Sequence, residues 1–416
     1  MAEHTSLKVW LVPPLNRGGL QEQFEQTAAA LAQLGVSVHV GDASAAAPNE
    51  IVHLFDAPAI FETLQQFLTA RAQGARIVVN PVYWNATRFF QQGLAGIDEP
   101  RGAQADLEER IRHVQRQAEY AARKLIFCHA DALLPLSPSE AALVAHDFDA
   151  PRDRMIIAPN GIGSVFAQPH SGDSFAQKYG VRDFILCAGR LDAVKNQLAL
   201  LRALRDESVA LVLIGKAETP EYLDLCQRQA QLSQGRVLFV PSLPREELAA
   251  AYAAARVHAL VSWFDVAPLA ALEAAASGCR VVLTSESGGR DYFGDDAWYC
   301  DPGDDLSIRH AVCAAYAAPA NPALRERVVR EFTWTHAAEQ TKRAYELAQD
   351  APRAEPDDYL AQAQSALAEL AELAVLQDES RAQLWQEKES LARERDAYAN
   401  GRVINTLNVL NRALKR

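Results

Sequence analysis

Short apolar runs alternate with helical patterns along the first half of the chain. Runs rich in Val, Ile and Leu are separated by segments in which apolar residues recur every three to four positions. Because strands that are apolar on both faces and alternate with helices build parallel sheets, this pattern predicts a doubly wound α/β domain over residues 1–170. We expect strands at 7–13, 36–40, 51–55, 76–80 and 131–136, and helices at 20–34, 59–73, 104–126 and 138–147.

A second alternating unit follows a polar stretch at 167–180, which predicts a linker. This unit predicts a second doubly wound domain over residues 171–348, with a closing helix that begins near Trp334. Ligands of such sheets bind at the carboxyl ends of the strands, so two domains in tandem predict a site in the cleft between them. We expect strands at 184–188, 209–214, 236–240, 257–261, 280–284 and 297–300, and helices at 196–205, 220–233, 245–254, 268–277 and 305–316.

The tail at 357–416 differs in composition from the two expected domains, because it is rich in Ala, Glu, Gln, Arg and Leu. It predicts a long helix with a weak coiled-coil pattern, either solvated or paired with a partner. One heptad position carries Leu370, Leu384, Leu391 and Tyr398. The basic amphipathic end at 402–416 leaves two interpretations open, namely a helix for self-association or docking of a partner protein and a peripheral contact with an anionic membrane.

Composition narrows the class of protein. The chain has 416 residues and a net charge of -12, and such an acidic balance argues against nucleic-acid binding, which depends on phosphate neutralisation. Its six cysteines show neither a CxxC pair nor a zinc-ligand spacing, which predicts free thiols and no metal site. The chain shows no signal peptide pattern and no apolar run of about 18–20 residues, so we expect a cytoplasmic protein.

Two cations follow the strand expected at 184–188. Arg190 and Lys195 stand where that strand gives way to a helix. The helix dipole disfavours cations at this end, so two of them indicate an anionic ligand. Fixed cations stabilise the charge that develops on a diphosphate when its bond to a sugar breaks, without a metal ion being required. The alternative is a surface turn with an ion pair.

Two carboxylates, Asp265 and Glu273, stand around the start of a later helix. Pro268 fits the first helical position, which would leave the backbone N–H groups of Leu269 and Ala270 for a phosphate. Carboxylates accept hydrogen bonds from the paired hydroxyls of a hexose or a ribose. Together with the cations, they predict a nucleotide-sugar site, although a buried structural ion pair is the alternative for Glu273.

Glycine loops follow two of the expected strands. Gly18 and Gly19 precede a helix, where a backbone without Cβ atoms can approach a phosphate. Residues 287–291 form a second such loop, which would shape the donor pocket. A tight turn explains either loop equally well. Neither has the GxGxxG spacing, which argues against a dinucleotide-dependent oxidoreductase.

These segments resemble the retaining glycosyltransferases of the GT-B fold, known as glycosyl transferases group 1. The resemblance covers roughly residues 7–345 and is specific for the family rather than for a substrate. Its motifs lie at 159–162, 188–197, 241–248, 265–278 and 288–295. Residues 52–55 and 290–295 are similar to members that build bacterial surface polysaccharides, such as O-antigens, and that often transfer mannose.

The resemblance implies a transfer of a hexose from a nucleoside diphosphate sugar to a glycan or lipid-linked acceptor, with retention of configuration and without a metal cofactor. It implies that Arg190 and Lys195, next to Gly189, hold the donor diphosphate. Glu273 would hold the ribose and Asp265 the donor sugar. The loop at Gly18 and Gly19 would close over the donor phosphates.

The chain departs from the family pattern at three places. Asp265 replaces the usual Glu, and Val266, Ala267 and Pro268 replace the usual Gly-Phe-Gly. Pro81 follows the strand that ends at Asn80, where many members carry an active-site His. His53 is a candidate replacement, although a histidine satisfied within the core explains it as well. Three alternatives therefore stay open: a catalytically impaired scaffold that acts through its tail, a sugar-nucleotide epimerase, and an assembly role in which the tail recruits a partner transferase or the membrane.

Overall fold

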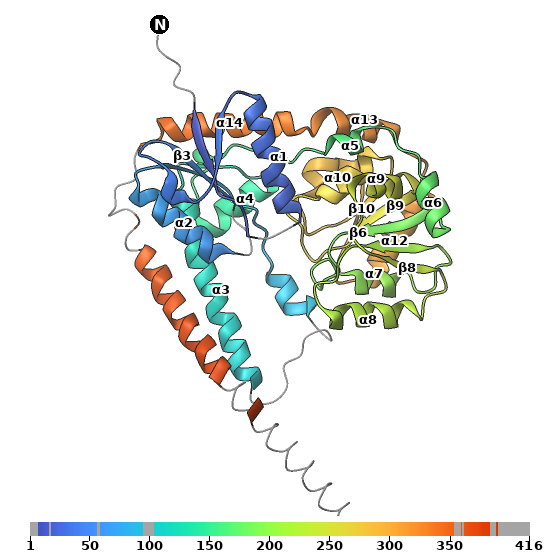
Figure 1. Ribbon diagram of the computed structural model, residues 1–416. Coiled ribbons are helices and arrows are strands. Elements are labelled where there is room, and N and C mark those ends of the chain that lie inside the picture. The colour runs from blue at the N-terminus through green and yellow to red at the C-terminus, as the bar shows by residue number, and fades with distance from the viewer. Residues whose placement is uncertain are drawn as a thin grey trace, which may run out of the picture. The chain divides into compact units, whose positions relative to one another are not determined.

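The computed structural model describes residues 7–15, 18–55, 59–94, 104–352, 359, 362–382 and 388–389 (Figure 1). Contacts divide the chain into two compact units. The first unit comprises residues 1–99 and 126–354 and holds both sheets, and the second comprises 100–125 and 355–416. The domain limits at 170, 348 and 357 remain predictions.

The first sheet is parallel, and in the described residues it has five strands in the order β2-β1-β3-β4-β5. Its strands are β1 (Lys8–Leu11), β2 (Ser37–Val40), β3 (Ile51–Phe55), β4 (Arg76–Asn80) and β5 (Ala132–Leu133). Its connections carry α1 (Gly19–Gln33), α2 (Ile60–Ala72), the π-helix η2 (Phe89–Gly93), α3 (Gln104–His129) and α4 (Pro138–Phe148). The strands β3, which is fully buried, and β4, which is buried except at Arg76, begin and end where the sequence predicts.

The second sheet is also parallel, and its six described strands follow the order β11-β10-β9-β6-β7-β8. Its strands are β6 (Phe184–Ala188), β7 (Leu211–Ile214), β8 (Val237–Val240), β9 (Ala255–Leu260), β10 (Arg280–Thr284) and β11 (Trp298–Cys300). Its helices are α5 (Ser164–Ala167), α6 (Asp173–Tyr179), α7 (Gln197–Ala203), α8 (Pro220–Ala230), α9 (Arg245–Ala254), α10 (Leu269–Ala276), α11 (Gly289–Phe293), α12 (Asp305–Ala317) and α13 (Pro322–Glu331). Apolar clusters cover both faces of this sheet, so the predicted doubly wound architecture is confirmed.

The strand orders fix where ligands can bind. The order of the second sheet reverses between β6 and β9, and that of the first sheet reverses between β1 and β3. At such a switch point, the loops that follow two adjacent strands run to opposite faces of the sheet. A crevice therefore forms between these two loops. The loops after β6 and β9 carry Lys195 and Asp265, respectively. The fold therefore places the two predicted constellations next to each other.

Two predicted elements differ from the structure. The linker at 167–180 contains α6, which packs against α9 and ends at Gly180 in a left-handed conformation. The closing helix is α14 (Trp334–Asp350), which the sequence grouped with the second domain. It packs instead against α1, β4 and β5, and Trp334 and Tyr345 join the core of the first sheet (Figure 1). An amphipathic pattern shows that a helix has a buried face, but not which sheet covers it.

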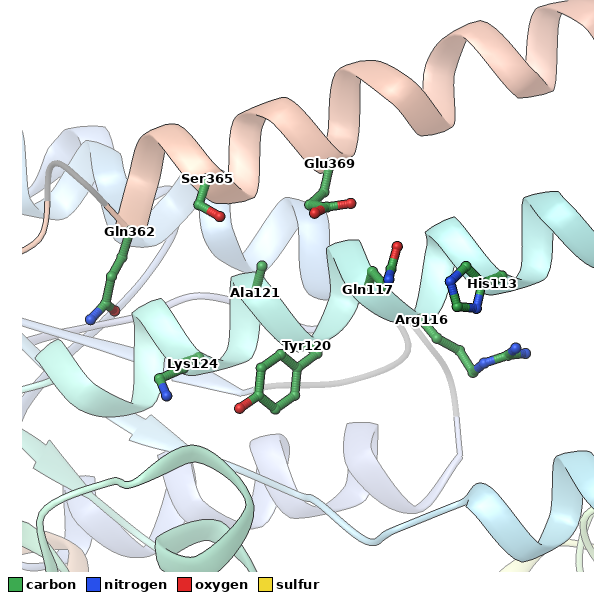
Figure 2. A pocket seen from close by; sticks show the side chains of 9 residues that line it. All are labelled: His113, Arg116, Gln117, Tyr120, Ala121, Lys124, Gln362, Ser365 and Glu369. Carbon is green, nitrogen blue, oxygen red and sulfur yellow. The ribbon is translucent and has the colours of Figure 1, made fainter.

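The second unit contains the first part of α3 and a helix at residues 362–382, which run antiparallel (Figures 1 and 2). The buried residues of this pair are Leu107, Val114, Ala118, Ala122 and Leu125 on α3, with Ala363, Ala366, Leu373 and Leu376 on the other helix. Leu370 of the predicted coiled-coil position is only half-buried, and Leu384, Leu391, Tyr398 and residues 402–416 lie outside the described residues. The coiled coil thus remains a prediction. Among the described helices, none combines the length and apolarity needed to cross a bilayer.

Candidate functional site

The loop after β6 is held by its own side chains. The Lys195 backbone N–H donates to Asp192 Oδ1 over 2.7 Å, and Gln197 Nε2 donates to the Arg190 carbonyl over 2.6 Å. Asn196 adopts a left-handed conformation, and its amide donates to the carbonyls of Val261 and Pro302. The loop is therefore fixed to the end of β9, on the other side of the switch point.

Lys195 and Asp265 are brought into direct contact. The Lys195 Nζ donates to Asp265 Oδ2 over 2.7 Å, and the two side chains are 22% and 11% exposed. Because both side chains are shielded, solvent screens the attraction between them less than in an exposed pair. The contact therefore differs from the ion pair of a surface turn. The cation and the carboxylate predicted for the two halves of a nucleotide sugar thus stand side by side.

Arg190 lies at the rim of the crevice. Its side chain is 57% exposed, with Asp192 at 3.1 Å and Glu218 at 3.8 Å. The pair with Glu218 is exposed and holds the guanidinium weakly, whereas Asp192 is a buried carboxylate that is only 3% exposed. The strand end stays open as well, because a Cβ on Gly189 would meet nothing within 4 Å. A Cβ on Gly215, at the end of β7, would overlap the Gly189 carbonyl.

The second glycine loop supports Asp265. The Asp265 N–H donates to the Glu286 carbonyl over 3.1 Å, and the Gly288 N–H donates to the Asp265 carbonyl over 3.2 Å. A Cβ on Gly288 would lie 2.5 Å from the Val266 carbonyl oxygen and 3.0 Å from Ser137 Oγ, so only glycine fits between them. This loop therefore positions the backbone that carries Asp265.

The start of α10 differs by one position from the prediction, since Pro268 is the N-cap residue and Leu269 the first helical residue. The Leu269 N–H donates to the Ala267 carbonyl over 2.8 Å, so it is already engaged. The N–H of Ala270 remains the candidate phosphate donor of this predicted pair. Both residues are half-buried.

Glu273 lies one turn further along α10, and its carboxylate is shared with other charged groups. Arg245, the first residue of α9, donates to Glu273 Oε1 over 3.0 Å. The same guanidinium lies 2.7 Å from the Oε2 atom of Glu22, on α1 of the first sheet. Burial raises the pKa of Glu273 to about 8, Arg245 opposes that rise, and Glu22 adds to it.

Glu22 ties this cluster to the predicted phosphate loop. Gly18 caps α1 with a φ of 112°, a conformation that favours glycine, and its carbonyl accepts the Glu22 N–H over 3.1 Å. Gly18 and Gly19 are exposed, and a Cβ on either would meet nothing within 4 Å. The structure thus places both glycines at the end of α1 that carries Glu22.

His53 is locked in the core of the first sheet. Its Nε2 lies 2.8 Å from Asn80 Oδ1, and its Nδ1 lies 2.8 Å from the Tyr345 hydroxyl. The Asn80 oxygen can only accept, so Nε2 carries the proton and Nδ1 accepts from the tyrosine. Burial lowers the pKa of His53 to about 4. Both ring nitrogens are used, so the structural interpretation of this histidine is the one that its contacts support.

A small pocket lies at the switch point of the first sheet. It has a volume of about 130 Å³ and lies between the ends of β1 and β3 and the start of α2. Val12, Leu54 and Phe55 form apolar walls, and Glu62 and Gln66 add polar groups. Apolar walls with a few polar groups are typical of small-molecule sites.

The segment after β4 docks against the loop that leads to Asp265. Phe89 of η2 lies 6.5 Å from the Trp263 ring and 6.0 Å from the Phe264 ring, measured between centroids. Arg88 donates to Asp301 over 2.6 Å and to Glu286 over 3.3 Å. The two domains thus meet through two arginines, Arg88 of the first domain and Arg245 of the second.

A larger cavity, of about 450 Å³, lies in the second unit (Figure 2). His113, Arg116 and Lys124 of α3 line it together with Ser365 and Glu369 of the opposite helix. None of the predicted site residues lines it. The chemistry predicted from the sequence therefore belongs to the strand ends of the first unit.

Two of the residues that shape the site, Arg245 and Glu22, were missed by the sequence analysis. Arg245 carries the signal that selected Arg190 and Lys195, namely a cation at the start of a helix, where the dipole disfavours it. Glu22 had no such signal, because an acidic residue in the first turn is the usual pattern.

Two parallel α/β domains, with charged loops at the switch point of the second sheet, define the GT-B fold. Residues 173–330 match the family Glycosyl transferases group 1, so this region is similar to the domain of that family. The catalytic domain of starch synthase IV from Arabidopsis thaliana, bound to ADP and acarbose, has a similar fold with a TM-score of 0.60 and 16% identity, covering 83% of this chain and 100% of that one.

Curated relatives are also glycosyltransferases. The chain is 25% identical over 252 residues to an uncharacterized glycosyltransferase, MJ1607, of Methanocaldococcus jannaschii, which covers 52% of the chain and 60% of that protein. It is 25% identical over 320 residues to a D-inositol 3-phosphate glycosyltransferase of Pseudarthrobacter chlorophenolicus, which covers 65% of the chain and 75% of that protein. The matched region thus spans less than two thirds of the first relative.

Proposed function

We propose that the protein is a retaining glycosyltransferase that moves a hexose from a nucleoside diphosphate sugar to a glycan or lipid-linked glycan. The contact between Lys195 and Asp265 supports this most strongly. A cation suited to a diphosphate and a carboxylate suited to sugar hydroxyls meet at the switch point where ligands of such sheets bind. The nucleotide in the starch synthase structure fits the same class of donor.

In the proposed reaction, the bond between the anomeric carbon and the diphosphate oxygen breaks while the acceptor hydroxyl adds to the same face of the sugar. The acceptor proton passes to the departing phosphate oxygen, so the reaction uses no protein base at His53. Lys195 and Arg190 stabilise the negative charge on the leaving group. Because two cations stand there, we propose a reaction that needs no metal cofactor.

The donor would span both loops of the switch point. In this proposal Asp265 accepts hydrogen bonds from the sugar, and Glu273 accepts them from the ribose. The N–H of Ala270 and the open backbone at Gly189 contact the phosphates, and the loop at Gly18 and Gly19 closes over them. The acceptor enters from the first domain, where the pocket between β1 and β3 supplies apolar walls and carboxamide groups.

The finer assignment rests on the sequence resemblance. We propose that the acceptor belongs to a bacterial surface polysaccharide, that mannose is the transferred hexose, and that the protein works at the inner face of the plasma membrane. In this proposal residues 357–416 bind a partner protein or a second copy of the chain.

Calorimetric titration with UDP, GDP, ADP and their common hexose conjugates tests the donor site, with EDTA present. We expect one nucleotide to bind, and Lys195→Ala and Arg190→Ala to weaken binding by about tenfold or more, as loss of a charge-assisted contact predicts. Arg202→Ala is the matched control, because Arg202 is an exposed cation that pairs with Asp305.

The scaffold and the epimerase each have their own outcome in this experiment. Unchanged affinity in Lys195→Ala would contradict the diphosphate role. Absence of binding to any nucleotide would favour the scaffold that acts through its tail. Conversion of the donor sugar to its epimer without an acceptor would favour the epimerase.

A further inference from the structure

One guanidinium serves two carboxylates from two different domains. Arg245 of the second domain lies 3.0 Å from Glu273 of the same domain and 2.7 Å from Glu22 of the first. The two acidic side chains are only 9% and 17% exposed. Two acidic groups and one guanidinium are thus enclosed together, and a single cation cannot fully compensate both carboxylates when both are ionised.

The residues around Arg245 fix the position of its guanidinium. It stacks on Phe166, with 5.0 Å between the guanidinium carbon and the ring centroid. Residue 163 is glycine, and a Cβ there would lie 2.5 Å from Arg245 Nη2. Gly163 therefore makes the room in which Arg245 reaches both carboxylates.

Glu22 is the less satisfied of the two acids. Its Oε1 atom is buried and has no hydrogen-bond partner among the described residues, while its Oε2 atom meets Arg245. A buried carboxylate oxygen without a donor is costly, so Glu22 draws on the same guanidinium that Glu273 needs. The strength of each contact depends on the other.

We propose that Glu22 and Glu273 compete for Arg245, so that the docking of the first domain, through Glu22, sets how well Glu273 can bind the ribose of the donor. This inference rests on the proposed function, which makes Glu273 the ribose ligand. Arg245 is a positioning residue, because it acts on the donor only through Glu273.

The direction of the effect follows from charge. Glu273 faces Arg245 and Tyr252 from α9 and Glu22 from α1. Burial raises the pKa of Tyr252 well above its ordinary value, so this phenol stays neutral. A pKa of about 8 leaves Glu273 mostly protonated at pH 7, and an acid that keeps its proton is a poorer acceptor for ribose hydroxyls. Binding of a nucleoside diphosphate should therefore strengthen as the pH rises through 8.

Nucleotide affinity measured from pH 6 to pH 9 with UDP, GDP and ADP tests the proposal. Glu22→Gln removes the competing charge, so the midpoint should move to lower pH, and the affinity at pH 7 should rise about fivefold for a shift of about one pKa unit. Glu25→Gln is the matched control. It removes the same charge from an exposed residue that lies one turn further along α1. Because the nucleotide titrates equally in both experiments, comparing the two variants cancels the pH dependence of the nucleotide itself.

Arg245 variants should move the profile the other way. Arg245→Ala leaves Glu273 without its cation, so the midpoint should rise and the affinity at pH 7 should fall about tenfold. Arg245→Lys should restore part of the affinity. Gly163→Ala should act like Arg245→Ala without a change of charge, because the new methyl group displaces the guanidinium.

The outcomes separate this proposal from the proposed function. If the wild type binds a nucleotide and Lys195→Ala does not, but the profiles of Glu22→Gln and Glu25→Gln coincide, the competition is wrong and the donor site stands. If Arg245→Ala loses affinity equally at every pH, Arg245 is only structural. If the wild type binds no nucleotide at any pH, both proposals fail.

Discussion

The imidazole of His53 donates from Nε2 to the Oδ1 atom of Asn80 over 2.8 Å, in the fully buried centre of the first sheet. Asn80 ends the strand after which many group 1 enzymes carry a histidine. Here the asparagine side chain donates back to the Leu134 carbonyl, so it ties β4 to the segment after β5. The histidine that the sequence offered as a candidate replacement thus helps to hold the sheet together.

Acid should destabilise the protein through its buried histidines. Burial lowers the pKa of His53 to about 4 and that of His258 to about 3, below the ordinary value of 6.5. The unfolded chain therefore binds more protons below pH 6.5, and stability is lost as the pH falls from 6.5 toward 4. At pH 5 each histidine should cost about 2 kcal/mol of unfolding free energy. Urea unfolding at pH 7 and pH 5 measures the loss, and equal stability would show that neither imidazole is kept neutral.

The pair of Lys195 and Asp265 should couple in a double-mutant cycle. Removing one partner leaves the other partly buried without its countercharge, so Lys195→Met and Asp265→Asn should each cost about 2 kcal/mol, between the values for exposed and for buried pairs. The double variant should cost clearly less than the sum. Additive losses in denaturant unfolding would mean that the contact contributes nothing in solution.

Arg88→Ala should separate donor binding from transfer. Its contacts with Asp301 and Glu286 are about one-third exposed or more, so their loss should cost about 1 kcal/mol of stability or less. The same change releases the η2 segment from the loop before Asp265. We expect unchanged nucleotide affinity and a lower transfer rate to acceptor. A parallel loss of nucleotide affinity would place Arg88 in the donor site instead.

Removing residues 357–416 should leave nucleotide affinity unchanged, because no predicted donor residue lies there. The deletion uncovers Val114, Ala118 and Ala122 on α3, which are buried in the described pair of helices. We therefore expect faster amide hydrogen exchange in α3 and a tendency to associate. Lost nucleotide binding in a deletion variant that retains its secondary structure would assign the tail to the donor site.

The sequence predicted the bounds of four strands correctly. β3, β4, β6 and β10 match the expected bounds, because each is a short and mainly apolar stretch that has the length of the strand. β5 is much shorter than expected, since only Ala132 and Leu133 pair with β4 while the rest of the apolar run turns into the loop before α4.

The candidate site was predictable only in part. Loops at strand ends follow from the alternation of elements, which is why Lys195 and Asp265 could be singled out together. The link between Glu22 and Arg245 joins residues more than 200 positions apart, and no periodic pattern encodes such a contact. Likewise, the displaced start of α10 depends on the turn at Ala267, which a proline alone does not specify.

The position of α14 constrains how this protein can be made. The helix that covers β4 and β5 is encoded after the whole second sheet, yet Trp334, Ala337 and Tyr345 complete the core of the first. During vectorial synthesis, the first sheet must therefore wait with an uncovered apolar face until the ribosome has finished the second. The order of translation and the order of completion are opposite for the two sheets.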